Sequence, residues 1–369
     1  MEIHTEGVKY AGSKRKLLPH ILAMVSELPC RSVWDGFSGT TRVSQALAQS
    51  GFQVISSDIS ELSEVFATAY LQNRQSPEKY QELIDHLNGL SSVDGWFSEH
   101  YGGDVLPDGS SVQPDGRKRP FQRKNMRKTD AIREELERLN LDSITHAVGL
   151  VSLILALDAV DNTLGHFASY LRVWSPRSYR DLTLRVPKLW VNERENDVFR
   201  ADIFDLLGKV RADVAYLDPP YGSANEKMPP SRIRYTSYYH FWKTLIINDR
   251  PAIFGKALRR NDSADLLSAS VFEEFRKDST GKFLAVEAIH RMLREIQVPW
   301  VLLSYSSRGR ATTRDLMEVI QDVGRLEKIE TIGHPRHVMS HMQWTREWIQ
   351  HLEEPNREYL FLIRRSRFS

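Results

Sequence analysis

Three short, largely apolar segments, each ending in an aspartate, limit most strongly what this chain can fold into. They are residues 32–35, 53–58 and 214–218, and each is followed at once by turn residues. Short apolar runs bounded by turns are typical of strands, and a helical pattern through Leu47 joins the first two. A strand, a helix and a further strand in this order form a βαβ unit. We therefore predict an α/β protein with a twisted, mainly parallel sheet.

The flanking sequence extends this pattern. Apolar residues at three- and four-residue spacing after Ser13 predict a capped amphipathic helix before the first strand. Towards the C-terminus we expect helices over 198–207 and 285–296, and strands over 300–304 and 359–363.

Residues 62–192 interrupt the α/β rhythm, and we interpret them as an insertion. The region has helical stretches around a loop rich in Gly, Pro and Asp at 102–116, and a basic run follows. Its apolar segment 147–157 is well short of the roughly 20 residues that cross a bilayer, so we expect a buried helix and no membrane span. The chain thus divides into a main domain over 1–61 and 193–369 and an inserted, mostly helical module over 62–192.

Composition excludes certain kinds of site. The 369 residues carry 50 Lys plus Arg and 48 Asp plus Glu, a net charge of +2, so a nucleic-acid surface must come from local basic clusters. A single cysteine, Cys30, excludes an internal disulfide and a cysteine-rich zinc site, and no histidines show H-E-x-x-H spacing. We expect no metal. The polar N-terminus lacks the apolar stretch of a signal peptide, which favours a cytoplasmic protein.

Acids at the strand ends indicate a ligand site. Ligands of parallel sheets bind beyond the carboxyl ends of the strands, where glycine turns and helix N-termini present backbone donors. Asp35 precedes a turn over 36–41, and Asp58 lies about 20 residues further on, the offset at which an acid accepts hydrogen bonds from ribose hydroxyls. The turn is not G-x-G-x-x-G, so this pattern alone is weak evidence for a nucleotide cofactor.

The sequence Asp218-Pro219-Pro220-Tyr221, directly after the third strand, carries the most specific chemistry. The exocyclic amino group of adenine is a poor nucleophile because its lone pair is delocalised into the ring. A carboxylate and a carbonyl held by prolines can accept its two hydrogens and aim the lone pair at a methyl group. Tyr221 supplies a ring on which a flipped base can stack. A surface turn is the alternative, since Asp-Pro often begins turns.

Together these motifs resemble the Dam-type adenine-specific DNA methyltransferases, and most closely the branch found in type IIS restriction systems. The segments that carry the resemblance are 9–14, 35–41, Asp58, 165–171, 218–221, 238–240 and 303–307. It implies a class I S-adenosylmethionine methyltransferase fold, base flipping, and direct methyl transfer to adenine in double-stranded DNA. The insertion would be the target-recognition region, and the main domain would be catalytic.

The resemblance also implies roles for individual residues. The cofactor contacts would be Tyr10, Lys14, Asp35, Phe37, Gly39, Asp58, Asp202 and Asp218. Lys14 would bind the methionine part, Asp58 the ribose and Asp202 the adenine edge. Solvated surface side chains are the alternative for Lys14 and Asp202. The family usually has a second glycine where this sequence has Thr41, which puts tight cofactor binding in doubt.

Two groups of side chains are candidates for DNA contact. The basic run in the insertion consists of Arg117, Lys118, Arg119, Arg123, Lys124, Arg127 and Lys128. A solvated charged loop is its alternative. Aromatic residues are concentrated over 235–242; we expect half or more of them to pack internally, and Tyr238 or His240 to face DNA.

Other activities fit these motifs less well. Pro29-Cys30 resembles the nucleophile pair of cytosine-ring methyltransferases, but it precedes the first strand, and lone cysteines commonly pack as small hydrophobes. Methylation of RNA adenine or of a protein glutamine uses a similar acceptor pair, more often with Asn in the place of Asp218. Intact Asp58 and Asp218 argue against an inactive nucleic-acid-binding protein. We predict an adenine-specific DNA methyltransferase of a restriction-modification system, with a cognate endonuclease as a further partner.

Overall fold

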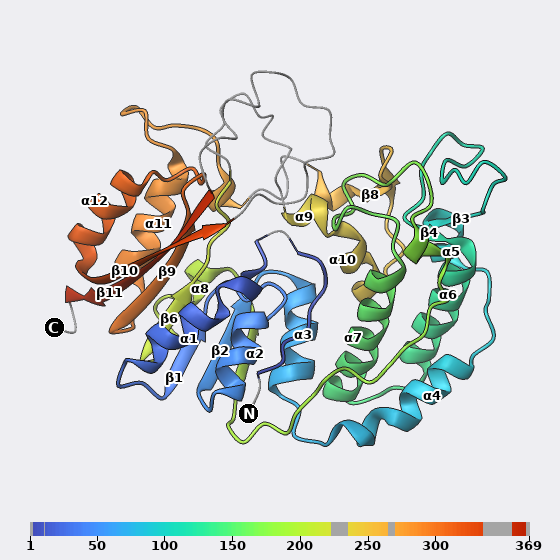
Figure 1. The fold of residues 1–369 in the computed structure, drawn as a ribbon, viewed down its shortest axis with the longest axis horizontal. Helices are drawn as coiled ribbons and strands as arrows, with labels where there is room; N and C mark the ends of the chain where they lie inside the picture. Colours follow the sequence, from blue (N-terminus) through green and yellow to red (C-terminus); the bar gives the residue numbers. More distant parts are fainter. Residues whose placement is uncertain (1–2, 11, 223–234, 265–269, 335–355, 367–369) are drawn as a thin grey trace. The chain divides into compact units, whose positions relative to one another are not determined.

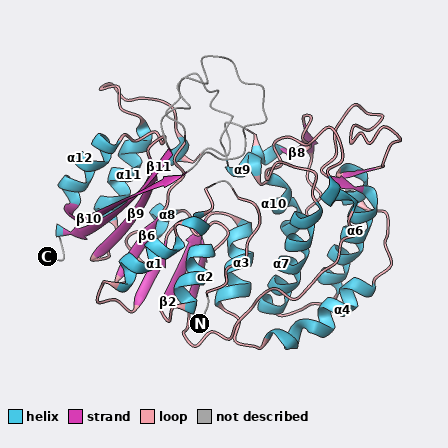
Figure 2. Cartoon of the chain, viewed as in Figure 1, coloured by secondary structure: helices cyan, strands magenta, loops and turns pink. Residues whose placement is uncertain are grey.

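The structure is a computed structural model, and it describes residues 3–10, 12–222, 235–264, 270–334 and 356–366. Helices and strands alternate along much of the chain (Figures 1 and 2). The chain divides into two compact units. The first comprises 1–16, 38–202 and 234–268, and the second comprises 17–37, 203–233 and 269–369.

Seven strands form the main sheet, in the order β10-β11-β9-β6-β1-β2-β5. In the first unit, β2 (Gln53–Asp58) and β5 (Asp197–Arg200) pair in parallel. In the second, β1 (Ser32–Asp35), β6 (Val214–Leu217) and β9 (Trp300–Ser306) are parallel neighbours. The C-terminal strand β11 (Asn356–Arg365) runs antiparallel to both β9 and β10 (Gly324–His334). The predicted α/β fold with a mainly parallel sheet is confirmed.

The core of the second unit is built on the strand that precedes Asp218. All four residues of β6 are buried, as are Val33 and Trp34 of β1. Helices α11 (Leu284–Glu295) and α12 (Thr313–Val323) pack on each other, and a capping box between Thr312 and Asp315 starts α12. The unit also contains α1 (Leu18–Ser26) and α8 (Ile203–Leu206). Strand β6 pairs with β1 on one side and with β9 on the other, so its end is firmly fixed.

The first unit is largely helical. Its helices are α2 (Arg42–Gln49), α3 (Glu61–Leu71), α4 (Gln81–Gly89), α5 (Trp96–His100), α6 (Arg123–Arg138), α7 (Ser143–Val160), α9 (Tyr235–Tyr238) and α10 (His240–Ile247). Two short pairs of strands lie outside the main sheet: β3 (Gly102–Gly103) pairs with β4 (Phe121–Gln122), and β7 (Ile253–Phe254) pairs with β8 (Arg259–Arg260). One hydrophobic core joins residues of the predicted insertion to Val8 and Phe241, which lie outside the insertion in sequence.

Helix α7 is the predicted buried helix over 147–157. It is long and apolar enough to cross a membrane, but 61% of it is buried inside the protein. Leu150, Leu153 and Leu157 are among its buried residues, and the helix packs on α3. Its composition is therefore that of a core helix.

The predicted helix over 198–207 is wrong in its first half. Residues 197–200 form β5, and only 203–206 are helical. Three of the four β5 side chains are exposed, because β5 lies at the edge of the sheet. An edge strand with little burial lacks the apolar alternation that distinguishes a strand from a helix in sequence.

Candidate active site

Asp58 is held at the end of β2 by backbone amides. The Gly39 N–H donates to its Oδ2 and the Ser60 N–H to its Oδ1, each over 2.9 Å. Ser60 also caps α3, accepting a hydrogen bond from the Leu62 N–H at 3.1 Å. Burial raises the pKa of the Asp58 carboxyl above its ordinary value, and the hydrogen bonds from Gly39 and Ser60 lower it part of the way back. The carboxylate is thus a rigidly placed acceptor.

The turn beside Asp58 requires unusual backbone geometry. Gly39 and Thr41 have φ angles of 51° and 58°, in the left-handed region that favours glycine. A Cβ on Gly39 would lie 3.4 Å from the ring of Tyr10. Thr41 is fully buried, and its hydroxyl accepts a hydrogen bond from Gln45 Nε2 at 3.0 Å. The substitution of the family's usual glycine therefore places a β-branched residue in a strained conformation.

The N-terminal cofactor candidates are packed into the first unit. Tyr10 stacks on Tyr239 with ring centroids 4.3 Å apart, and it also contacts Tyr235 at 5.3 Å. Lys14, at the start of the short 3-10 helix η1 (Lys14–Lys16), is 7% exposed. The alternative of a solvated surface lysine is therefore wrong. Asp202, by contrast, is an exposed acid just before α8.

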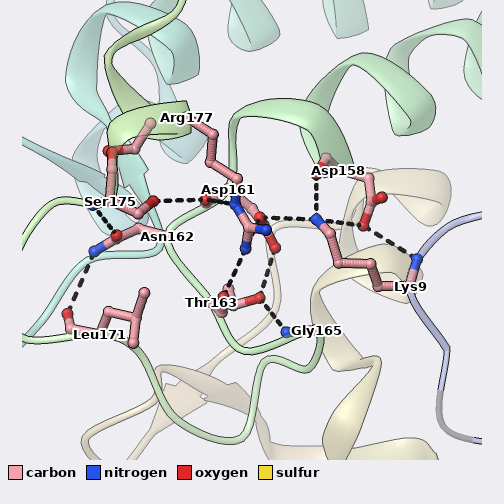
Figure 3. A network of polar contacts seen from close by, with 10 residues as sticks. Lys9, Asp158, Asp161, Asn162, Thr163, Gly165, Leu171, Ser175 and Arg177 are labelled. Atoms are coloured by element: carbon pink, nitrogen blue, oxygen red, sulfur yellow. Dashed lines mark hydrogen bonds and ion pairs between the residues drawn. The ribbon is translucent and has the colours of Figure 1, made fainter. Parts of the chain in front are cut away.

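A polar network that includes Lys9, the residue before Tyr10 in sequence, fixes the segment 163–171 (Figure 3). Lys9 Nζ donates to the Asp158 carbonyl at 2.6 Å and contacts Asp161 Oδ1 at 3.2 Å. Asp161, almost fully buried, also forms an ion pair with Arg177 at 2.5 Å and accepts from the Thr163 hydroxyl. The Gly165 N–H donates in turn to the Thr163 hydroxyl at 2.9 Å.

In the second unit, Asp218 follows β6 and is linked to Tyr221. The Tyr221 hydroxyl lies 2.5 Å from Asp218 Oδ1, 3.0 Å from Ser304 Oγ and 3.2 Å from Glu358 Oε2. The Tyr221 carbonyl accepts from the Arg310 N–H at 2.9 Å. Pro219 is buried and Pro220 partly buried. The four residues of the motif are therefore fixed by β6, β9 and β11 together.

Ser304 and Glu358 were not singled out from the sequence. Ser304 falls within the segment 303–307, and Glu358 immediately precedes the predicted strand over 359–363. A carboxylate beside a strand end was the available signal for Glu358. Its link to Tyr221 spans 137 residues of sequence, and no local pattern contains it.

Asp35 and Phe37 lie at the start of the glycine turn. Asp35, the last residue of β1, is 1% exposed. Phe37 packs edge-on against Phe272 with ring centroids 5.3 Å apart. Between them, Gly36 leaves no room for a side chain, because an added Cβ would lie 2.6 Å from Leu217. The strand pair β1 and β6 thus fixes the glycine at this position.

The basic run is neither a loop throughout nor simply solvated. Its second half begins α6, and most of its charges have partners within the chain. Arg119 is buried and pairs with Asp115 at 2.8 Å. The other contacts are Arg117–Asp115 at 3.8 Å, Arg123–Asp104 at 2.8 Å, Lys124–Asp181 at 2.5 Å, Arg127–Asp94 at 3.0 Å, and Lys128 with the Asn88 carbonyl at 2.7 Å. Lys118 is partly buried. Contact of this run with DNA stays a prediction.

The aromatic residues over 235–242 divide as expected, with one correction. Phe241 and Trp242 are core residues. His240 is also buried; its Nε2 lies 3.1 Å from the Phe167 carbonyl, and burial lowers its pKa to about 3. Its expected exposure to DNA is therefore wrong. Tyr238 is partly exposed and stacks on His166 at 4.6 Å, so a DNA role for Tyr238 remains a prediction.

Cys30 fits the structural interpretation given to it. Its thiol is half-buried and lies 3.5 Å from the Val25 carbonyl. Burial raises the pKa of the thiol to about 11, with the negative charge of Asp213 adding to the effect. A thiol held neutral in this way is a poor nucleophile. Among the described residues, no group of three or more His, Cys, Asp or Glu side chains is arranged to hold a metal ion.

Comparison with known proteins adds independent evidence. The family model of the D12 class N6 adenine-specific DNA methyltransferases matches residues 10–292. Modification methylase StsI of Streptococcus sanguinis is 27% identical over 98% of this chain and 52% of its own length. The type II methyltransferase M.FokI of Planomicrobium okeanokoites is 25% identical over 97% of this chain and 53% of its own. M.NlaIII of Neisseria lactamica is 25% identical over 88% of this chain and 91% of its own. The chain thus spans about half the length of the first two relatives.

Proposed function

Because the chain belongs to the D12 class of N6 adenine-specific DNA methyltransferases, we propose that it methylates the exocyclic amino group of adenine in double-stranded DNA. S-adenosylmethionine is the methyl donor of this class. We further propose that the enzyme acts at a specific DNA sequence as the modification component of a restriction-modification system. StsI and M.FokI, which carry the names of such systems, support that part.

The observation that carries the proposal is the arrangement of Asp218. Its carboxylate stands at the end of a fully buried strand and is oriented by the Tyr221 hydroxyl at 2.5 Å. A fixed carboxylate oxygen and a backbone carbonyl of the proline motif can accept the two amino hydrogens of adenine. The nitrogen lone pair is then freed from the ring and aimed, which supplies the orientation on which such a transfer depends.

The residues around Asp58 fit the expected methyl donor. Each oxygen of the Asp58 carboxylate accepts one backbone hydrogen bond, and a carboxylate oxygen can accept a second one. Ser63 and the Ile59 backbone also act on this carboxylate. Ribose hydroxyls are donors that suit such a fixed acceptor. We assign Asp58 to the ribose, Lys14 to the methionine carboxylate, and Tyr10, Asp35, Phe37, Gly39 and Asp202 to further cofactor contacts. When bound, S-adenosylmethionine supplies an electrophilic methyl group.

DNA binding and base flipping complete the proposal. The target amino group is inaccessible inside a duplex, so the adenine must leave the stack before it reaches Asp218. We assign Tyr221 to stacking on this base, and the basic run and Tyr238 to DNA contact. The cytoplasm is the expected site of action. A cognate endonuclease is the expected partner in the cell.

The test is methyl transfer with labelled S-adenosylmethionine and duplex DNA, followed by identification of the modified base. We expect label in N6-methyladenine, and mapping of plasmid DNA from expressing cells should locate it at one short sequence. Label in cytosine would refute the proposal. Transfer to RNA or to a protein glutamine, in place of duplex DNA, would favour the related activities that use a similar acceptor pair.

A further inference from the structure

Tyr221 stands between two carboxylates. Its hydroxyl oxygen lies 2.5 Å from Asp218 Oδ1 and 3.2 Å from Glu358 Oε2. A phenol carries one proton and can donate it fully to only one carboxylate at a time. The shorter distance identifies Asp218 as the main acceptor in this structure, and Glu358 as a second acceptor within reach.

We propose that Tyr221 and Glu358 form a relay that removes from Asp218 the proton released by the methylated amino group. This inference rests on the proposed function. When the adenine nitrogen bonds to the methyl group, the carbon–sulfur bond of the donor breaks and sulfur keeps its electron pair. The nitrogen is left with a positive charge and gives one proton to Asp218. Asp218 then protonates the Tyr221 oxygen while the original Tyr221 proton moves to Glu358, which releases it to water.

The chemistry of Tyr221 requires this transfer to be concerted. Burial raises the pKa of its hydroxyl well above the ordinary value, and the negative charges of Asp218 and Glu358 raise it further. A free phenolate is therefore strongly disfavoured. The hydroxyl can pass a proton on only by gaining one from Asp218 as it loses one to Glu358.

The surroundings suit a fixed relay with an exit. The Tyr221 carbonyl accepts from the Arg310 N–H at 2.9 Å and from the Tyr305 hydroxyl at 3.3 Å, so the backbone of Tyr221 is held without Glu358. Ser304 on β9 contacts the Tyr221 hydroxyl at 3.0 Å and positions it. Glu358 on β11 is partly exposed, which opens the end of the relay to water.

Other charged and titratable groups face the same cluster. Tyr216 of β6 is buried, and burial raises its pKa well above the ordinary value, with Asp218, Asp35 and Glu358 adding to the effect. Tyr216 is thus neutral. Asp35 of β1 adds negative charge at Tyr216. Tyr305 of β9 and Arg310, which follows β9, contact the Tyr221 carbonyl. Acids outnumber bases around Tyr221, which favours uptake of a proton by the cluster.

The decisive variants are Glu358→Gln, Tyr221→Phe and their combination. Steady-state methyl transfer would be measured across pH in water and in deuterium oxide. We expect kcat to fall roughly tenfold or more in each single variant, with KM for DNA and for S-adenosylmethionine nearly unchanged. The solvent isotope effect and the acid limb of the pH profile should change as well. The double variant should be no slower than the slower single variant, because both residues act in one chain.

A measurement on the free protein gives a second readout. Infrared titration of the carboxylates should show Asp218 taking up its proton at higher pH in Tyr221→Phe, where the donor to its ionised form is lost. In Glu358→Gln it should do so at lower pH, because a neighbouring negative charge is removed. The control is Glu327→Gln on β10, whose carboxylate pairs with Arg325 at 2.6 Å, and it should behave as the parent in every assay.

The outcomes separate the relay from the proposed function. A parent protein that methylates adenine, with Glu358→Gln unchanged in kcat and pH profile, overturns the relay alone. Lower kcat with the parent's pH profile and isotope effect gives Glu358 a purely structural role and also overturns it. A parent that methylates no adenine overturns the proposed function. If Glu358→Gln fails to fold, Tyr221→Phe decides through the same pH profile and titration.

Discussion

Asp58 and Asp218 end strands in the two units of the chain, yet different groups hold their carboxylates. Asp58 is bound by the backbone amides of Gly39 and Ser60, whereas Asp218 is bound by the hydroxyl of Tyr221. Backbone amides can only donate, so these two contacts hold Asp58 as an acceptor, with the Ser63 side chain as a further partner. A hydroxyl both donates and accepts, so Asp218 can exchange protons with its neighbour. The difference suits one residue for binding and the other for chemistry.

The largest expected effect comes from removing the carboxylate that we assign to chemistry. Asp218→Ala should lower methyl transfer by at least about 10³-fold, because the amino group loses its acceptor. Binding of S-adenosylmethionine should stay measurable by calorimetry, since Asp58 and its amides are untouched. Asp218→Asn is the matched variant: it keeps an oxygen acceptor but cannot take a proton. Full activity of Asp218→Ala would contradict the assignment.

A smaller effect is expected at the carboxylate that we assign to binding. Asp58→Ala should weaken S-adenosylmethionine binding by about 1.5–3 kcal/mol, the contribution of hydrogen bonds to a charged acceptor. The matched control is Asp213→Ala. Asp213 Oδ2 also accepts two backbone amides, from Arg31 at 2.7 Å and Ser32 at 2.9 Å, but we assign it no ligand. Equal dissociation constants for both variants and the parent would reduce Asp58 to a structural residue.

The raised pKa of Asp58 gives this binding a dependence on pH. The carboxyl of an acid whose pKa is raised becomes protonated at a higher pH than usual, and it then loses part of its capacity to accept. We therefore expect affinity for S-adenosylmethionine to fall as pH is lowered, beginning above the range in which an ordinary aspartate titrates. Calorimetry over a pH series would measure it. The same fall in Asp58→Asn, which cannot titrate, would assign the effect to another group.

The basic run can be compared with the two aspartates. Most of its charged side chains pair with carboxylates of this chain, and DNA phosphates can take the place of those carboxylates. Alanine at Arg123, Lys124, Arg127 and Lys128 should flatten the salt dependence of DNA binding. Since each already has a partner within the chain, we expect a change of about one or two units of slope, fewer than four released counterions. Binding constants against salt for variant and parent would measure it.

The control variants for the basic run change its acidic partners and leave its arginines and lysines unchanged. Asp104→Asn and Asp94→Asn remove the acids paired with Arg123 and Arg127. If these arginines bind phosphate, both variants should bind DNA more tightly than the parent at low salt. Parallel salt plots for the alanine variant, with no gain in the asparagine variants, would show that the run serves only the fold.

The interior of the sheet could be predicted from sequence, but its edges could not. Strands β1, β2 and β6 are largely buried, and an acid stands at the end of β1 and β2 and directly after β6, so their sequences are distinctive. The two strands that were mistaken or not predicted, β5 and β10, lie at the two edges. Their side chains are more exposed, as Phe199 of β5 and Ile329 of β10 show at 41% and 45%. Pairing on one side, rather than apolar content, makes them strands.

The candidate site, too, could be predicted from sequence only in part. Asp58 and Asp218 follow from their positions after strands, because local sequence fixes what a strand end presents. Tyr221 was identified with its motif, but its hydrogen bonds to Ser304 and Glu358 depend on the order in which β6, β9 and β11 assemble. The burial of His240 likewise depends on Phe167, which lies 73 residues away. Local patterns do not encode such contacts.

We expect the smallest effect for substitutions of Thr41. They test how rigidly the backbone of the turn holds Asp58. Replacing Thr41 by glycine relieves strain worth about 1–2 kcal/mol at its φ of 58°. It also removes the hydrogen bond from Gln45, worth about 1 kcal/mol, and adds about 0.5–1 kcal/mol of chain entropy to the unfolded state. These contributions nearly cancel, so we expect the free energy of unfolding of Thr41→Gly to stay within about 1 kcal/mol of the parent.

Thr41→Ala separates the two effects at this position. It loses the same hydrogen bond but keeps a Cβ in the left-handed conformation, so it should be less stable than Thr41→Gly, by up to about 1 kcal/mol. Thermal and denaturant unfolding of both variants would measure the difference. Neither change removes a partner of Asp58, whose amides come from Gly39 and Ser60, so affinity for S-adenosylmethionine should change little. An alanine variant as stable as the glycine variant would mean that the turn adjusts its backbone, and Asp58 would then be held less rigidly than its two amide contacts indicate.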